Sequence, residues 1–255
     1  MLAACARPDV GAAGSSTAAP PSESKPRAAI AAGDTIDVFD EAGRLGTARI
    51  DSVIPDPHAP DLTLYAASIR VDGSDAWQPY CNLDRDGRNA AFAVSGVWSV
   101  NGPVSGEGVT LACTSGAIGK CIRMGYRPWD SLDAGSMSDL LTACTRMIRA
   151  DYCGNGQTHT KDGTWIDVYD RFGIQKREPR PDVPERFEAA WGPTGATYLT
   201  VGRWTDDVDS IVRECPEKLK GRVGPSRSPE QIAHEFPETM LYDDHPIDPK
   251  ERLMH

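Results

Sequence analysis

Short segments of alternating apolar and polar residues occupy most of the chain between residues 34 and 220. The stretch TIDVFDEAG, residues 35–43, alternates Ile36 and Val38 with polar neighbours, which is the period of a β-strand. It ends in Asp40-x-x-Gly43, and these residue types suit a type I turn. Four further segments have the same character: DLTLYAASIRV, AAFAVSGVWSV, GVTLAC and TGATYLTVGRW. They are bounded by the turn signals Asp72-Gly73, Asp86-Gly87 and Asn101-Gly102, so we predict antiparallel strands.

One strand-and-turn pattern occurs twice. WIDVYDRFG, residues 165–173, repeats the pattern of residues 35–43, with Asp170 and Gly173 in the turn positions. An internal duplication is one interpretation, and two hairpins that obey the same turn chemistry are the other, which we prefer.

Helical spacing is found in two places. In residues 136–150 the apolar positions Leu140, Leu141, Cys144 and Met147 lie on one helix face, and Ser136 or Ser138 can cap its start. A shorter helix is predicted within residues 205–219, with Thr205 as the candidate cap. The predicted fold is therefore of the α+β class: β-rich antiparallel sheets or hairpins with one or two short helices.

The two ends of the chain differ from this domain. Residues 6–33 are rich in Ala, Ser, Pro and Gly, and residues 221–255 are polar and broken by proline. Neither segment carries the apolar periodicity that a packed element needs. We therefore predict a tether within residues 1–33, one globular domain over residues 34–220, and a largely disordered tail over residues 221–255.

The cysteines indicate where the protein resides. In MLAACA, the residues before Cys5 resemble a bacterial lipobox, the end of a signal peptide at which the cysteine is lipidated. We expect the rest of that signal peptide upstream of the assigned start. Setting Cys5 aside leaves an even set that suits three disulfides in an oxidising compartment. Its members are Cys81, Cys113, Cys121, Cys144, Cys153 and Cys215. We expect a lipid anchor in the cell envelope, and Ala6 after the cysteine favours the outer membrane over the inner.

Composition and charge limit the kinds of binding partner that the protein can have. A hydrophobic content of 40% is enough for one substantial core, and no apolar run reaches the length of a membrane-spanning helix. The formal charge of −10 and the lack of a Lys/Arg cluster argue against nucleic acid as a partner. The partners that remain are the membrane, through the anchor, and an envelope protein, a peptide or a glycan. Nothing in the sequence calls for a cofactor.

Residues 144–170 hold the densest set of chemically active side chains. One interpretation makes Cys153 a thiol nucleophile, with His159 as base and Asp151, Asp162 or Asp167 as the orienting acid. The other, which we prefer, is a disulfide between Cys144 and Cys153 that removes the thiol, and the same logic pairs Cys113 with Cys121. No metal site is expected: there is no C-x-x-C, and the calcium-like run NLDRDGRN has Ala93 where a glutamate is required.

The polar stretch that follows Cys153 is a candidate recognition loop. It joins two glycine-rich turn signals on what should be a rigid corner between a helix and a strand, and such loops often carry binding. A plain solvated turn is the alternative. The candidate ligand-facing residues are Asp151, Tyr152, Asn155, Gln157, His159 and Asp162. Tyr126, Trp129, Trp165 and Trp191 could line a groove beside it, although core packing is the more common role of such residues.

Three blocks of the sequence resemble one known family. They are LACTSGAIGKCIRMGYRPW, RADYCGNGQTHTKDGTWIDVYD, and FEAAWGPTGATYLTVGRW with ECPEKL after it. Together they are similar to the ADYC-domain family of bacterial exported and lipoprotein-like chains, over roughly residues 90–219. The resemblance implies an envelope-associated domain and transfers no catalytic residue. Tyr198 stands where a cysteine is expected in similar chains. We therefore expect a cell-envelope lipoprotein that acts as a non-catalytic binding module, with an envelope hydrolase that uses Cys153 or His159 as the alternative.

Overall fold

The fold is taken from a computed structural model, which describes residues 30–40, 42–70 and 76–253. Cys5, most of the tether and the Asp72-Gly73 turn lie outside the described residues. Within them, no helix has both the length and the apolar character that a bilayer crossing requires.

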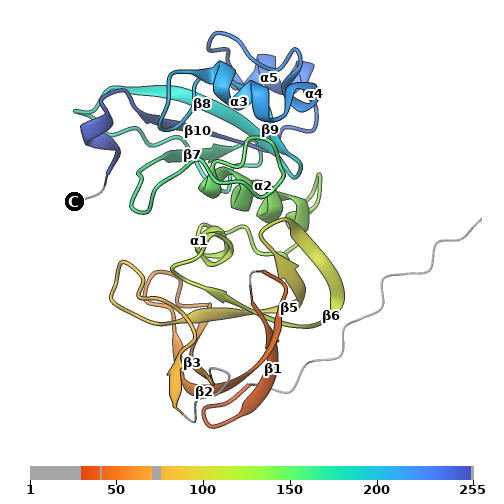
Figure 1. Cartoon of the computed structure of the whole chain (residues 1–255), viewed down its shortest axis with the longest axis vertical. Helices are drawn as coiled ribbons and strands as arrows, with labels where there is room; N and C mark the ends of the chain where they lie inside the picture. The colour runs from red at the N-terminus through yellow and green to blue at the C-terminus, as the bar shows by residue number, and fades with distance from the viewer. Residues whose placement is uncertain (1–29, 41, 71–75, 254–255) are drawn as a thin grey trace, which may run out of the picture. The chain divides into compact units, whose positions relative to one another are not determined.

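The first half of the domain is a small β-barrel (Figure 1). Its strands are β1 (Thr35–Phe39), β2 (Leu45–Pro55), β3 (Thr63–Arg70), β5 (Ala91–Ser99) and β6 (Gly102–Cys113), and the short β4 (Trp77–Pro79) pairs with β3. Neighbouring strands are antiparallel except where β1 meets β6, a parallel pairing of Phe39 with Thr110. That pairing closes the barrel.

Local turn chemistry fixes the register of these strands, as predicted. The Gly43 amide donates to the Asp40 carbonyl at 2.8 Å, and the Asp40 carboxylate accepts from the amides of Ala42 and Arg44. Asn101-Gly102 joins β5 to β6, with Ser99 paired to Gly102. The predicted strands and turns of the barrel are therefore confirmed wherever the structure describes them.

The second half contains a separate four-stranded sheet of order β7-β10-β8-β9. Its strands are β7 (Asp167–Asp170), β8 (Glu185–Gly192), β9 (Gly195–Leu199) and β10 (Leu241–Pro246). The preferred interpretation of WIDVYDRFG as a hairpin is wrong, because β7 pairs with the distant β10 rather than with the next strand along the chain.

The prediction of a disordered tail is also wrong. β10 lies between β7 and β8, and all six of its residues are buried. Before it, α5 (Pro229–Glu235) begins with a capping box in which Ser228 and Gln231 exchange hydrogen bonds. The compact domain therefore runs well beyond residue 220, because its second sheet needs a strand from the tail.

Two helices, α1 (Ala117–Arg123) and α2 (Met137–Arg149), lie between the barrel and the second sheet (Figure 1). The predicted cap of α2 is confirmed, since the Ser136 hydroxyl accepts from the Asp139 amide at 3.1 Å. Helices α3 (Val208–Glu214) and α4 (Pro216–Leu219) fall where one short helix was expected. The cap of α3 is Asp207, which accepts from the Ser210 amide, and not Thr205. The α+β class is confirmed, with five α-helices and the 3-10 helix η1 (Pro249–Arg252) in the part of the chain that the structure describes.

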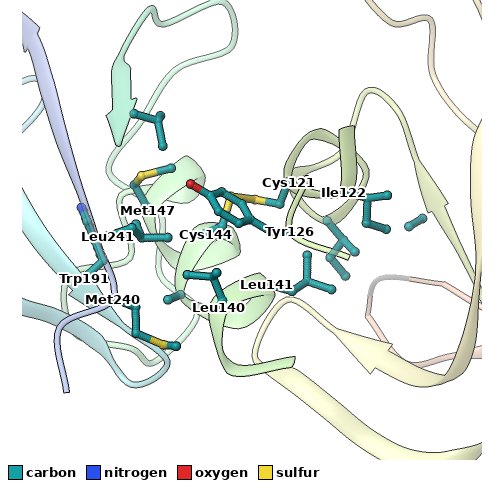
Figure 2. Close-up of a cluster of buried hydrophobic side chains, with 14 of the residues drawn as sticks. Cys121, Ile122, Tyr126, Leu140, Leu141, Cys144, Met147, Trp191, Met240 and Leu241 are labelled. Atoms are coloured by element: carbon teal, nitrogen blue, oxygen red, sulfur yellow. A yellow bond between two sulfur atoms is a disulfide. The ribbon is translucent and has the colours of Figure 1, made fainter. Parts of the chain in front are cut away.

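The core is organised around α2, as Figure 2 shows. Leu140, Leu141 and Met147 of this helix are fully buried. They lie among Cys121, Ile122 and Tyr126 from the α1 region and Trp191, Met240 and Leu241 from the second sheet. One helix therefore supplies apolar surface to both halves of the domain, and this joins them into a single core.

The internal cysteines form three disulfides, as expected, but both local pairings were wrong. The bonds are Cys81–Cys113, Cys121–Cys144 and Cys153–Cys215. Cys144 sits in the middle of α2 and faces α1, whereas Cys153 lies beyond the end of α2, where the chain has already reversed. The two thiols therefore point to different parts of the core, despite their closeness in sequence.

Candidate functional site

The corner predicted from the sequence begins where α2 ends. Ala150 adopts a left-handed conformation with φ of 49°, and this reverses the chain. The next residue, Asp151, is fully buried; its carboxylate accepts from the amides of Asn155 and Gly156 and is paired with Arg146. Asp151 therefore holds the corner together, and its assignment as a ligand-facing residue is wrong.

Tyr152 is buried as well. Its hydroxyl donates to Glu188 at 2.9 Å and accepts from the Arg203 amide at 2.7 Å, while its ring stacks on Trp191 at 5.3 Å. Burial, together with the charge of Glu188, raises the pKa of Tyr152 well above its usual value. Tyr152 is therefore a neutral core residue whose hydroxyl makes two hydrogen bonds, and it does not face a ligand.

Two glycines allow this corner to lie flat against the β8–β9 turn. Gly154 and Gly195 both have positive φ, 69° and 111°. A Cβ on Gly154 would overlap the Thr194 carbonyl, and one on Gly195 would lie 2.6 Å from the Tyr152 carbonyl oxygen. The Ala196 amide donates to that same carbonyl at 2.9 Å. Backbone contact of this kind leaves no room for a side chain.

The reactive groups of the corner are used in its structure. Cys153 is bonded to Cys215, so it cannot serve as a thiolate nucleophile in this state. His159 is half-buried: its Nδ1 lies 3.1 Å from the Ala150 carbonyl and its Nε2 lies 3.0 Å from the Glu214 carboxylate. Both ring nitrogens face oxygen acceptors, so no nitrogen is directed at a substrate. The acid that pairs with His159 is Glu214, 55 residues further along the chain, and no pattern in the sequence indicated it.

The exposed part of the corner is narrower than predicted. Asn155, Gln157 and Asp162 are exposed, as expected of ligand-facing residues. The loop that carries them is tied at its start, because Arg149 donates to the Gly156 carbonyl and Thr158 donates to the Arg149 carbonyl.

The far end of this loop is tied as well. The Trp165 amide donates to the Arg252 carbonyl at 2.8 Å, and the Trp204 indole donates to Thr164 at 3.1 Å. Lys161 lies over the Trp204 ring, 3.9 Å from its centroid. The corner therefore presents a polar loop on a fixed backbone, and we call residues 155–163 the corner loop.

The four aromatic residues do not form one groove. Tyr126 and Trp191 are fully buried in the core, as the alternative interpretation expected. Trp165 is half-buried beneath Arg180, and Trp129 is 50% exposed in the loop before α2.

Behind the corner lies a buried ionic network that the sequence analysis missed. Arg203 is 1% exposed and pairs with Glu188 at 2.9 Å and with Asp243 at 2.8 Å. It also donates to the Met147 carbonyl at the end of α2, and Trp191 donates to Asp243 at 2.7 Å. Burial and the neighbouring Glu188 raise the pKa of Asp243. The network joins α2, β8 and β10.

The calcium-like run, residues 82–89, forms a turn, as the turn signal Asp86-Gly87 predicted. The carboxylate of Asp84 accepts from the amides of Asp86 and Arg88 and from the hydroxyl of Thr114. Burial alone would raise the pKa of Asp84, but these hydrogen bonds outweigh it and hold the pKa below its usual value. A different set of acids could hold a metal ion: Asp167, Glu185 and Asp244 each place one oxygen within 4.8 Å of the others.

These features define a disulfide-linked α+β domain whose corner is built around the sequence Ala150-Asp151-Tyr152-Cys153. Residues 31–205 match the family model described as the ADYC domain, which covers more than half of the chain. The chain therefore belongs to the ADYC domain family. Neither the curated proteins nor the solved structures contain a match. The family match ends before α3, so Cys215 and the central strand β10 lie outside it.

Proposed function

We propose that this protein is an exported, lipid-anchored binding module of the cell envelope, and that it binds its ligand through the corner loop. The observation that carries the proposal is the construction of that loop: exposed polar side chains on a backbone fixed at both ends by half-buried groups. A loop that is already ordered loses little conformational entropy when it binds.

The groups that could support hydrolysis have structural roles instead. Cys153 is in a disulfide, Asp151 is buried, and His159 is held between Ala150 and Glu214. These roles favour a binding module over the alternative of a hydrolase. A histidine-acid hydrolase would still predict that His159→Ala abolishes an envelope hydrolase activity without altering the fold.

The chemistry of the corner loop suits a polar ligand. Gln157 offers an amide, Asp162 a carboxylate and Lys161 an ammonium group above the Trp204 ring. Amide, carboxylate and ammonium groups can hydrogen-bond the hydroxyls of a sugar or the backbone of an extended peptide. The ligand class we propose is therefore a glycan or peptide of the envelope.

The export and anchoring part of the proposal rests on the three disulfides and on Cys5. Disulfides persist in oxidising compartments, and a multiply acylated cysteine holds a domain stably at a membrane. Expression with a complete signal peptide, followed by fractionation, tests this part. Wild-type protein is expected in the outer-membrane fraction, and Cys5→Ser is expected in the soluble periplasm with its disulfides intact. Equal membrane recovery of the two forms would contradict lipid anchoring.

Binding is tested with the full-length Cys5→Ser chain, which isolates the domain from the anchor. Cosedimentation with purified cell-wall sacculi, and separately with outer-membrane fragments, measures the bound fraction. The double variant Gln157→Ala/Asp162→Ala is expected to lose most of the binding. The matched control is Gln78→Ala/Asp130→Ala, which removes the same two groups from exposed positions elsewhere. Equal binding by both double variants would place the binding surface outside the corner loop.

A further inference from the structure

Three carboxylates converge at one end of the second sheet. Asp167 begins β7, Glu185 begins β8, and Asp244 lies in β10 between them. Asp167 and Asp244 are directly opposite each other. Glu185 is opposite Pro246, two residues from Asp244, so it faces the same side of the sheet. Acids placed directly opposite each other in a sheet destabilise it unless something positive lies between them.

All three carboxylates are out of water. Asp244 is fully buried, Asp167 is 5% exposed, and the side chain of Glu185 is 3% exposed. A buried charge is costly unless it is paired, so each acid requires a partner.

Two arginines and several hydrogen bonds provide some of the partners that these acids require. Arg177 pairs with Asp244, which also accepts from the Tyr169 hydroxyl at 3.1 Å. The Glu178 amide donates to Asp167 at 3.0 Å. Arg180 donates its amide to Glu185 Oε1 at 3.1 Å, and its Nε lies 3.7 Å from the same oxygen. Two guanidinium groups facing three carboxylates leave one negative charge uncompensated.

The uncompensated charge can be assigned to one atom. Glu185 Oε2 is buried and has no hydrogen-bond partner among the residues that the structure describes. The other oxygen of Glu185 already accepts a hydrogen bond from the Arg180 amide, so Oε2 is the oxygen whose negative charge has no partner. A buried carboxylate oxygen without a partner is destabilising, and it needs an explanation where it lies beside two further acids.

We propose that Asp167, Glu185 and Asp244 bind one calcium ion, which links β7, β8 and β10. Calcium binds carboxylate oxygens in a flexible geometry, and this set offers only carboxylates. Zinc prefers nitrogen and sulfur ligands, which the set lacks, and magnesium retains several waters that a buried site would have to admit.

An acidic hollow lies next along the chain to Glu185, although none of the three acids lines it. It has a volume of about 450 Å³, and Pro184, the residue before Glu185, forms part of its wall. The charged residues that line it are Asp182, Asp248 and Glu251, all of them acidic. A cleft lined by one sign of charge concentrates ions of the opposite sign.

The site is tested on the full-length, disulfide-bonded chain after treatment with EDTA and removal of the chelator. Calorimetric titration with calcium chloride up to about 5 mM is expected to give one saturable site per chain, in the affinity range of extracellular modules. Magnesium chloride and zinc chloride are titrated in parallel and are expected to bind at least tenfold more weakly. Glu185→Gln is expected to lose at least tenfold in calcium affinity, whereas Glu217→Gln, the same charge change at an exposed position of α4, is expected to bind as wild type.

Thermal unfolding separates an ion site from a purely structural role. Without calcium, Glu185→Gln is expected to unfold at the same temperature as wild type or higher, because it removes an uncompensated buried charge. With free calcium at ten times the wild-type dissociation constant, the unfolding equilibrium of wild type shifts about tenfold toward the native state, and that of the variant shifts by at most about twofold. Absence of saturable calcium binding by wild type, or a Glu185→Gln variant that is less stable than wild type in EDTA, would overturn the proposal. Asp167→Asn is the second variant. It is likewise expected to lose at least tenfold in calcium affinity and to be at least as stable as wild type in EDTA.

Discussion

Replacing Cys153 and Cys215 together by alanine removes the covalent link between the corner and the junction of α3 and α4. The two cysteines are 62 residues apart in the chain. The chain-entropy relation for a closed loop of this length gives a loss of about 4 kcal/mol in the free energy of unfolding. A bond between Cys144 and Cys153, which are nine residues apart, would contribute only about 2.6 kcal/mol by the same relation.

Guanidinium unfolding followed by tryptophan fluorescence measures this loss, and the single variant Cys153→Ala measures the pairing. If the bond is Cys153–Cys215, the single variant leaves Cys215 as the thiol that alkylation labels, and Cys144 stays protected by Cys121. Labelling of Cys144 in that variant would refute the pairing. A loss below about 1 kcal/mol in the double variant would refute the entropic reasoning, since the unfolded chain would then gain little freedom from the missing link.

Three further predictions concern the corner and its supports. Gly154→Ala is expected to cost more than about 3 kcal/mol in chemical unfolding, because its Cβ would overlap a backbone carbonyl; Gly163→Ala, with a similar φ and open space around it, should cost only about 1 kcal/mol. Arg203→Met leaves two carboxylates buried without a cation and is expected to cost about 3–5 kcal/mol, so a stable variant in the same assay would contradict the ionic network. Asp84→Asn is expected to cost about 1–3 kcal/mol at pH 7. Because the folded pKa of Asp84 is lowered, its contribution is complete above the unfolded pKa of about 4 and is lost as pH falls through the folded pKa; the difference between the two proteins should therefore shrink as pH falls below the unfolded pKa, and a difference that stays constant down to the acid limit of folding would contradict this assignment.

Local chemistry explains which elements could be predicted from the sequence. The turn at Asp40, the Asn101-Gly102 turn and the Ser136 cap each depend on residues within four positions of one another. Such contacts need only those residues in that order, so the turn after β1, the β5–β6 hairpin and α2 follow from pattern, whereas the strand β2 was not predicted. The number of disulfides was predictable from an even cysteine count. Their pairing was not, because it depends on which way α2 faces once it is packed.

The corner was located correctly, but its polar residues were assigned to the wrong side of the surface. Asp151 and Tyr152 were expected to face a ligand because they begin a polar loop held on a rigid corner, and such loops often carry binding. Their burial depends on partners far away in the sequence: Tyr152 meets Glu188 and Arg203, and Arg203 in turn meets Asp243. No spacing rule within the corner contains that information, and only Asn155, Gln157 and Asp162 have the exposure that was predicted.

The strand β10 shows why charge patterns mislead at the end of this chain. Its sequence, Leu-Tyr-Asp-Asp-His-Pro, has too many ionisable residues to predict a buried central strand. Each acid is nevertheless supplied with a partner by another segment: Asp243 with Arg203 and Trp191, and Asp244 with Arg177 and Tyr169. Because these partners precede the acids by at least 40 residues, the burial of the strand depends on the rest of the second sheet. The same dependence makes the segment after residue 205 part of the folding unit, since without β10 the buried Arg203 would lose one of its two carboxylates and β7 would have no neighbour in the sheet.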